Sequence, residues 1–435
     1  MLRKFTISLA RFSTRNLSYS NVKKAILTSE FSLNKEWFDR HNDMKKLSLG
    51  GEYEWIATVQ KKFIGGGKAS AVDVDAAACG AEEKDQINDI LDLIYKLRHT
   101  DNASDFLPST EYATLRLLLK HDAIPEFFKV LNDPINYGIF PNEHMACLAM
   151  DYFISRDDFS SAARIASIVM QQEMFDSMLL NHLSVFSLMK FIELPTAERK
   201  MDENLLVVKE PFEEDDESPT FRYPYLKNKW NDNHFDIEDC GLLVSKSLKL
   251  FVDIIDYEDI KLKKSLELLS IVIGNKYKEL LQFLENNEIS FFKGSALSIL
   301  EKICNERLER LGEENEDEKK LLIEIISKIV DSFSGNNLLS DDIMKEFKKI
   351  QKEEENKLIN IQKVEFNLWN SHRENLLKIQ AEKLKLQFRL QEINKTRDEL
   401  KSKKEVLFFF ENRTTWELQA AEKTMLFEKM NISSK

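Results

Sequence analysis

The stretch NYGIFPNEHMACLAMDYFISRDDFSSAARIASIVMQQEMF, residues 136–175, decides the fold class of this 435-residue chain. Its first half has apolar residues three and four positions apart, which places them on one face of an α-helix: Met145, Leu148, Ala149 and Tyr152. A polar turn at residues 156–158 follows. The next segment shows the same spacing with small side chains that let another helix approach closely: Phe159, Ala162, Ala163, Ala166, Val169 and Met170. The stretch therefore predicts two helices joined by a short turn.

A similar pair of helices is predicted one unit earlier in the chain. Pro108 and Pro141 stand 33 residues apart, and each precedes two apolar helical segments. A constant period of this size is typical of helical-repeat proteins. A third unit is predicted from about Asp176. Because one hairpin cannot cover its own apolar face, neighbouring hairpins are expected to stack into a short solenoid; unrelated antiparallel helices in a bundle are the alternative.

The composition of the whole chain favours helices. Its 12 glycines and 8 prolines are too few for the turns of an all-β protein, and neither residue occurs after Gly335. We predict an all-α protein with a short helical-hairpin solenoid, a second helical region and a long charged C-terminal helix. The predicted parts are a presequence at 1–28, an N-terminal segment with a mobile Gly/Ala-rich loop at 29–81, helical repeats at 82–205, an acidic, proline-containing connector at 206–236, a second helical region at 237–335 and the C-terminal helix at 336–435.

The first 28 residues have the composition of a mitochondrial presequence. They contain six basic residues, several serines and threonines and no acidic residue. Leu2, Phe5 and Leu9 fall on one side of a helix with basic residues opposite. No apolar run approaches the ~20 residues of a membrane span. The segment predicts import into the mitochondrial matrix, with an ordinary surface helix or a membrane-surface anchor as alternatives. Without it the net charge of −12 becomes about −18.

The C-terminal helix contains a stretch with net positive charge in an otherwise acidic chain. Residues 373–404 include ten basic and five acidic residues. The negative net charge of the whole chain argues against nucleic-acid binding through a general basic field, but it leaves a local basic patch possible. The predicted RNA or partner contacts are Lys378, Lys383, Lys385, Arg389, Lys395 and Arg397. A solvated single helix with mixed charges is the alternative.

Two further features of the C-terminal helix bear on its partners. One heptad column is apolar, with Ile379, Leu386, Ile393 and Leu400, but the partner column holds Glu382, Arg389 and Thr396. The heptad pattern therefore disfavours a homodimeric coiled coil. Farther along, the stretch VLFFF at residues 406–410 and later apolar residues are expected to dock on a partner or to fold back.

No catalytic, cofactor or metal site is predicted. The stretch GGGKAS at residues 65–70 lacks the spacing and the Ser or Thr after lysine of a phosphate-binding loop. His144 and Cys147 share a helix face, but two ligands without a second pair do not make a zinc site. The four cysteines have no paired spacing, so no disulfide framework is indicated.

Four motifs carry a resemblance to one known family: LTSEFSLNKEWFDR at 27–40, IYKLRHT at 94–100, LLKHDA at 118–123 and YGIFP at 137–141. Together they resemble the animal mitochondrial ribosomal small-subunit protein twenty-seven family, a pentatricopeptide-repeat-like family of the mitoribosome. The similarity covers about residues 27–191. The signature residues of the repeat are Tyr137, Gly138, Ile139, Phe140 and Pro141. The resemblance implies a structural component of the mitochondrial small ribosomal subunit, with small-subunit rRNA and other mitochondrial ribosomal proteins as partners.

Pentatricopeptide arrays can read RNA one base per repeat through paired polar side chains. Here the reader positions fall near Thr114 and Cys147, and only the first has a suitable side chain. Two or three units would also address few bases. A scaffold that touches rRNA backbone and protein neighbours is favoured over a base reader. The same helical patterns also fit a free mitochondrial RNA-maturation or translation factor, or a coiled-coil scaffold unrelated to RNA.

Overall fold

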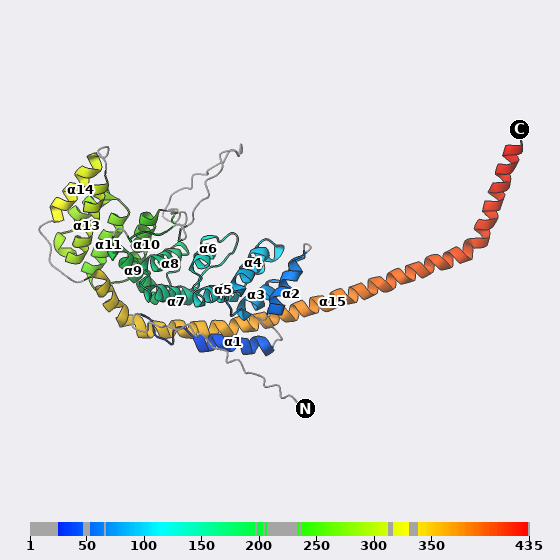
Figure 1. The fold of residues 1–435 in the computed structure, drawn as a ribbon, viewed down its shortest axis with the longest axis horizontal. Helices are drawn as coiled ribbons and strands as arrows, with labels where there is room; N and C mark the ends of the chain where they lie inside the picture. The colour runs from blue at the N-terminus through cyan, green and yellow to red at the C-terminus, as the bar shows by residue number, and fades with distance from the viewer. Residues whose placement is uncertain are drawn as a thin grey trace, which may run out of the picture. The chain divides into compact units, whose positions relative to one another are not determined.

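The computed structural model describes residues 25–46, 53–64, 67–195, 198–202, 205–206, 234, 237, 239–311, 316–329 and 338–433. Within these ranges the chain forms fifteen α-helices and no β-strand, which confirms the all-α prediction (Figure 1). The chain divides into two compact units, Met1–Asn370 and Ser371–Lys435. The predicted presequence up to residue 24 and most of the predicted connector lie outside the described residues.

The first helices of the chain include one that the sequence did not predict. The stretch at 65–81 was expected to be a mobile loop, but residues 71–80 form a helix, α3, in which every residue is buried. Ser70 and Asp73 form a reciprocal capping box at its start. Alanine is the strongest helix former, and its small side chain allows close packing, so the loop prediction was wrong. The helices here are α1 (Asn34–Lys46), α2 (Tyr53–Phe63), α3 (Ala71–Gly80) and α4 (Gln86–Arg98), followed by the short 3-10 helix η2 (Asp101–Asp105).

The predicted helical hairpins are present. Asp122 and Asp157 occupy the turns inside the first and second hairpins, and both have positive φ, 56° and 60°. Aspartate tolerates this left-handed conformation better than most residues. The helix pairs are therefore equivalent in their turns as well as in their apolar pattern. The helices are α5 (Pro108–Lys120), α6 (Ile124–Asn132), α7 (Glu143–Ile154), α8 (Phe159–Gln171) and α9 (Met178–Glu193). Their arrangement as a superhelical solenoid stays a prediction.

The second helical region continues from the hairpins. Its first helix contacts α8 and α9, and a core of buried side chains from Leu268 to Ile329 joins its later helices. These helices are α10 (Cys240–Ile254), α11 (Ile260–Ile273), α12 (Tyr277–Asn286), α13 (Gly294–Arg310) and α14 (Glu316–Ile329), with the 3-10 helix η4 (Ile289–Phe291) before α13.

The last helix, α15, runs from Leu339 to Ser433 over 95 residues. Its first part, up to Asn370, belongs to the first unit and lies against the hairpins, with α1 beside it (Figure 1). The second unit consists, in its described residues, of the remainder of α15 alone. No helix among the described residues is long and apolar enough to cross a bilayer.

Candidate nucleic-acid and partner interface

The face formed by α5 and α7 is packed against other parts of the same chain. Trp37 on α1, Tyr112 on α5 and Phe366 on α15 contact one another, with ring centroids 5.1 Å apart for Trp37–Tyr112, 5.6 Å for Trp37–Phe366 and 5.4 Å for Tyr112–Phe366. The Asn142 amide, at the start of α7, donates a hydrogen bond to Gln362 Oε1 on α15 at 2.9 Å. These contacts place α1 and α15 over the first helices of two hairpins.

The two expected base-reading positions are buried in this packing. Thr114 is 1% exposed and its hydroxyl donates to the Thr110 carbonyl at 2.7 Å. Cys147 is fully buried, and burial raises the pKa of its thiol. Neither side chain presents a polar group at the surface. Thr114 and Cys147 are therefore unavailable to a base in this packing.

The signature residues of the repeat shape the connection between α6 and α7. Gly138 has φ +61°, and a Cβ at this position would lie 2.7 Å from Arg98 Nε. Tyr137 and Ile139 are buried, whereas Phe140 is 46% exposed. The Phe140 N–H donates to Glu111 Oε2 at 3.1 Å, and burial raises the pKa of Glu111 to about 7. Tyr137, Gly138 and Ile139 thus fix the backbone path or fill the interior.

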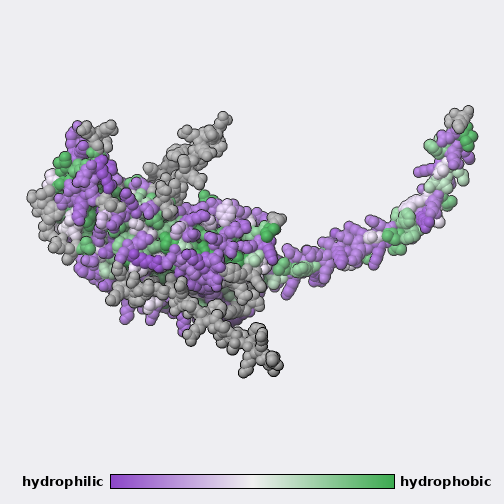
Figure 2. Space-filling view, in the orientation of Figure 1, coloured by the Kyte–Doolittle hydropathy of each residue, from purple (hydrophilic) through white to green (hydrophobic). Residues whose placement is uncertain are grey.

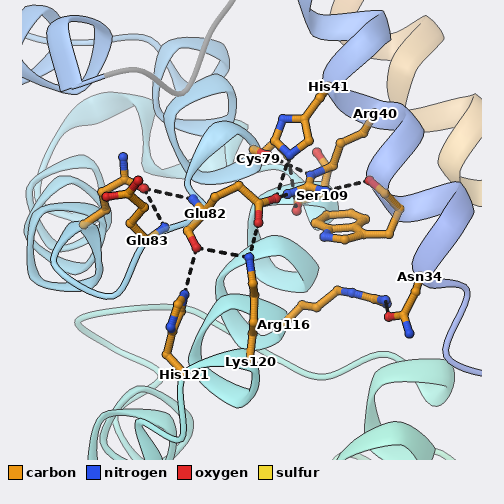
Figure 3. Close-up of polar contacts among 12 residues, drawn as sticks. Asn34, Arg40, His41, Cys79, Glu82, Glu83, Ser109, Arg116, Lys120 and His121 are labelled. Atoms are coloured by element: carbon orange, nitrogen blue, oxygen red, sulfur yellow. Dashed lines mark hydrogen bonds and ion pairs between the residues drawn. The ribbon is translucent and has the colours of Figure 1, made fainter. Parts of the chain in front are cut away.

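A charged cluster around Glu82 joins three separate parts of the first unit (Figure 3). Arg40 Nη2 and His41 Nε2 of α1 lie 2.5 and 2.6 Å from Glu82 Oε1, and Lys120 of α5 contacts the other carboxylate oxygen. Burial alone would raise the pKa of Glu82, but the hydrogen bonds from His41 and Lys120 and the charge of Arg40 lower it well below its usual range. The adjacent cavity is about 80 Å³, smaller than ligand pockets of ~300 Å³ or more. The cluster therefore ties α1 and α5 to the loop before α4.

His144 and Cys147 are buried on one face of α7. The two ring nitrogens of His144 contact the Phe31 carbonyl at 2.8 Å and the Tyr112 hydroxyl at 3.2 Å. Burial lowers the pKa of His144 to about 3. Across the described ranges no group of three His, Cys, Asp or Glu side chains could hold a metal ion. His144 links the segment before α1 to α5 and α7.

A groove of about 900 Å³ lies between α4 and α6. Tyr95 and Tyr137 contribute to its lining. Among the described residues, the charged side chains that line it are the acids Asp92, Glu126 and Asp133 and the cation Lys129. Phosphate groups are repelled by such an excess of carboxylates. The groove is therefore a poor site for RNA backbone.

The predicted contact residues on α15 all lie in the second unit, on exposed helix surface. Lys378 Nζ pairs with Glu374 at 2.8 Å, and Arg397 Nε lies 3.7 Å from Asp398. Among the described residues, no acidic side chain lies within 4.0 Å of the charged groups of Lys383, Lys385, Arg389 and Lys395. We call residues 373–404 the basic segment. Four of its six predicted contacts thus have cations without an intramolecular carboxylate partner.

The acidic residues of the basic segment are unevenly placed around the helix. At about 100° per residue, all five acids fall on one side, within roughly 200° of arc. The opposite side has Lys383, Arg397, Lys401 and Lys404 together with exposed Ile379 and Leu386. One side of the helix therefore combines positive charge and apolar surface without any carboxylate.

Beyond the basic segment α15 is apolar. The five residues from Val406 to Phe410 are between 50 and 67% exposed, and Figure 2 shows hydrophobic surface toward the end of this helix. Residues 406–433 continue α15 as helix, and folding back stays an untested alternative. Docking on a partner stays a prediction.

Comparison with protein-family models gives a match over nearly the whole chain. The model described as Mitochondrial 28S ribosomal protein S27 matches residues 1–399. The matched range includes all six predicted contacts and the YGIFP signature. It ends before the apolar stretch at 406–410.

Proposed function

Because the chain belongs to the mitochondrial 28S ribosomal protein S27 family, it is a protein of the mitochondrial small ribosomal subunit in the matrix, and we propose that it acts there as a non-enzymatic scaffold that binds rRNA and neighbouring ribosomal proteins. The family is one of ribosomal structural proteins. The proposal assigns rRNA contact to the basic segment and protein contact to the rest of α15. It assigns no catalytic residue and no cofactor.

The unpaired cations of the basic segment carry the proposal. An exposed lysine or arginine without a carboxylate partner keeps its full charge for an external anion, and each phosphate it neutralises releases a condensed counterion. Lys383, Lys385 and Arg389 fall within seven residues, about 9 Å of helix at 1.5 Å per residue. Such a run concentrates three positive charges within about two turns of the helix. The net charge of −12 makes this local concentration of positive charge more distinctive.

The packing of the first unit supports scaffolding over base reading. Thr114 and Cys147 are buried, and Asn142 is bonded to α15 rather than presented at the surface. A base reader needs polar groups that reach the edges of unstacked bases. The helical hairpins are therefore better suited to hold other elements in position.

The apolar end of α15 supports protein partners in addition to RNA. Phe408, Trp416 and Phe427 are exposed by 42% or more. Aromatic side chains are enriched in the buried centres of protein interfaces. We assign this end to a neighbouring ribosomal protein and not to a second copy of the chain, since the heptad partner column has Glu382, Arg389 and Thr396.

Sedimentation of mitochondrial lysate tests the proposal. Cells expressing the triple variant Lys383→Glu, Lys385→Glu and Arg389→Glu as the sole copy are compared with wild type on sucrose gradients at increasing salt. We expect the wild-type protein to remain with the small subunit at salt concentrations that release the variant. Removing three phosphate contacts should reduce the slope of log K against log salt by roughly 2–3.

A matched control separates RNA contact from net charge. Lys249, Lys278 and Lys302 are exposed residues of α10, α12 and α13, so Lys249→Glu, Lys278→Glu and Lys302→Glu make the same change in charge away from α15. We expect the control to sediment as the wild type does. Equal release of both variants would contradict rRNA contact by the basic segment. A free wild-type pool released by nuclease would instead support a free RNA-maturation factor.

A further inference from the structure

Residues 25–28 lie between α7 and the first part of α15, although the sequence assigned them to the presequence. The N–H groups of Ile26 and Leu27 donate to Asp151 Oδ1 of α7 at 2.7 and 3.2 Å. Asp151 is 2% exposed and the Leu27 side chain 6%. A buried carboxylate is costly unless hydrogen bonds compensate for lost water. These two N–H groups are therefore part of what stabilises Asp151 in its position.

The other side of the same segment is bound by α15. Gln351 Nε2 donates to the Ile26 carbonyl at 2.8 Å and to Glu355 Oε1 at 2.6 Å. The Thr28 hydroxyl donates to Glu355 Oε2 at 2.8 Å, and Glu355 is a buried residue. Three residues of the segment thus connect two helices that are about 200 positions apart in the chain.

We infer that import processing leaves Ile26, Leu27 and Thr28 on the mature chain, and that the presequence ends at or before Ala25. Processing is hydrolysis: water cleaves one peptide bond, leaving a carboxylate on the released peptide and an ammonium group on the mature protein. If Ile26 becomes the first residue, its ammonium group lies against the Asp151 carboxylate, which is favourable. Cleavage after Leu27 would remove both donors to Asp151, and cleavage after Thr28 would also remove the donor to Glu355. The inference rests on the matrix location, not on the proposed RNA contact.

The mature N-terminus tests the inference directly. The full chain is imported into isolated mitochondria, its new amino group is labelled, and the N-terminal peptide is identified by mass spectrometry. We expect the first residue to lie after Met1 and no later than Ile26. A mature chain that begins at Leu27 or beyond, or an imported chain that still begins at Met1, would overturn the inference.

A stability comparison tests the anchoring role separately. We expect a chain that begins at Ser29 to melt at least about 4 °C below one that begins at Ala25. The variant Thr28→Val keeps the side-chain shape but removes the donor to Glu355, and should lower the melting temperature by about 2 °C. Thr424→Val, which alters an exposed hydroxyl bonded to the Ala420 carbonyl, is the matched control. Equal melting of the two truncated chains would contradict an anchor at residues 25–28, whatever the gradients show.

Discussion

The carboxylate of Glu193, at the end of α9, accepts hydrogen bonds from the N–H and the hydroxyl of Ser340, at the start of α15, at 3.0 and 2.6 Å. A carboxylate at the N-terminus of a helix accepts hydrogen bonds from N–H groups that have no partner within the helix. Its negative charge also interacts favourably with the positive end of the helix dipole. The two residues are 147 positions apart. This contact fixes where α15 begins its path along the hairpins.

Removal of this contact should destabilise the first unit. We expect Glu193→Ala to lower the free energy of unfolding by about 1–3 kcal/mol, because the Ser340 N–H and hydroxyl lose a charged acceptor. Urea denaturation followed by circular dichroism measures the change. Glu198→Ala, at an exposed position, is the control; the contact has no stabilising role if both variants unfold at the same urea concentration.

Glu111 should make stability depend on pH near neutrality. Its pKa is raised to about 7 in the folded chain by burial, against 4.5 for the ordinary group. The folded state therefore binds more protons between these values, and stability falls as pH rises from about 4.5 to about 7 and is constant above. The variant Glu111→Gln resembles the protonated acid, so its free energy of unfolding should not follow this pH dependence. We expect the difference in unfolding free energy between the variant and wild type to shift in favour of the variant by about 2 kcal/mol from pH 5 to pH 8.

Denaturation of both proteins at the two pH values measures this difference. Glu279→Gln, at an exposed position of α12, gives the matched control. A difference between Glu111→Gln and wild type that stays constant with pH would show that Glu111 does not titrate in this range.

His144 should make the protein sensitive to acid. Its pKa is lowered by burial to about 3 from 6.5, so the unfolded state binds more protons between these values. The contribution of neutral His144 to the free energy of unfolding is therefore fully present above about pH 6.5. It decreases on acidification by up to ~1.4 kcal/mol per pH unit. In His144→Gln this dependence should disappear even though the variant is less stable at pH 7. The free energy of unfolding of both proteins is measured from pH 7 to pH 4.5. If another group were responsible, the two plots of unfolding free energy against pH would be parallel.

Gly138→Ala should destabilise the connection between α6 and α7. The residue has φ +61°, and the new Cβ would lie 2.7 Å from Arg98 Nε, so both backbone strain and a steric conflict follow. We expect a loss of about 1–3 kcal/mol in thermal or urea denaturation. Gly294→Ala, at the first position of α13, should be neutral or slightly stabilising. Equal behaviour of the two would mean that Arg98 moves aside without cost.

Local patterns in the sequence predicted the hairpins and the long C-terminal helix, because apolar spacing and the absence of helix breakers are local properties. The same local reasoning failed at α3. Asp75 lies in a run of small residues, and it is buried because Ser109 and Thr110 donate hydroxyl bonds to it at 2.5 and 2.9 Å. Nothing in the neighbouring residues indicates that partners about 35 positions away will be present.

The packing around the candidate interface was unpredictable for the same reason. The sequence placed Thr114 and Cys147 at reader positions but did not reveal that α1 and α15 would lie on that face. The contact of Trp37 with Phe366 joins residues from opposite ends of the first unit. The concentration of cations in the basic segment could be predicted, since the local excess of lysine and arginine over acids is a property of the sequence itself.

The path of α15 sets the order in which the molecule can be completed. A chain that enters the matrix with its N-terminus first delivers Ile26 long before Gln351 and Glu355, the residues that close over it. Contacts of such large sequence separation form late, because the intervening chain must first be available and ordered. The beginning of the protein thus stays open to a peptidase until almost 330 further residues have been imported. Closure by α15 then ends that interval, so that the last helix to arrive covers residues 26–28.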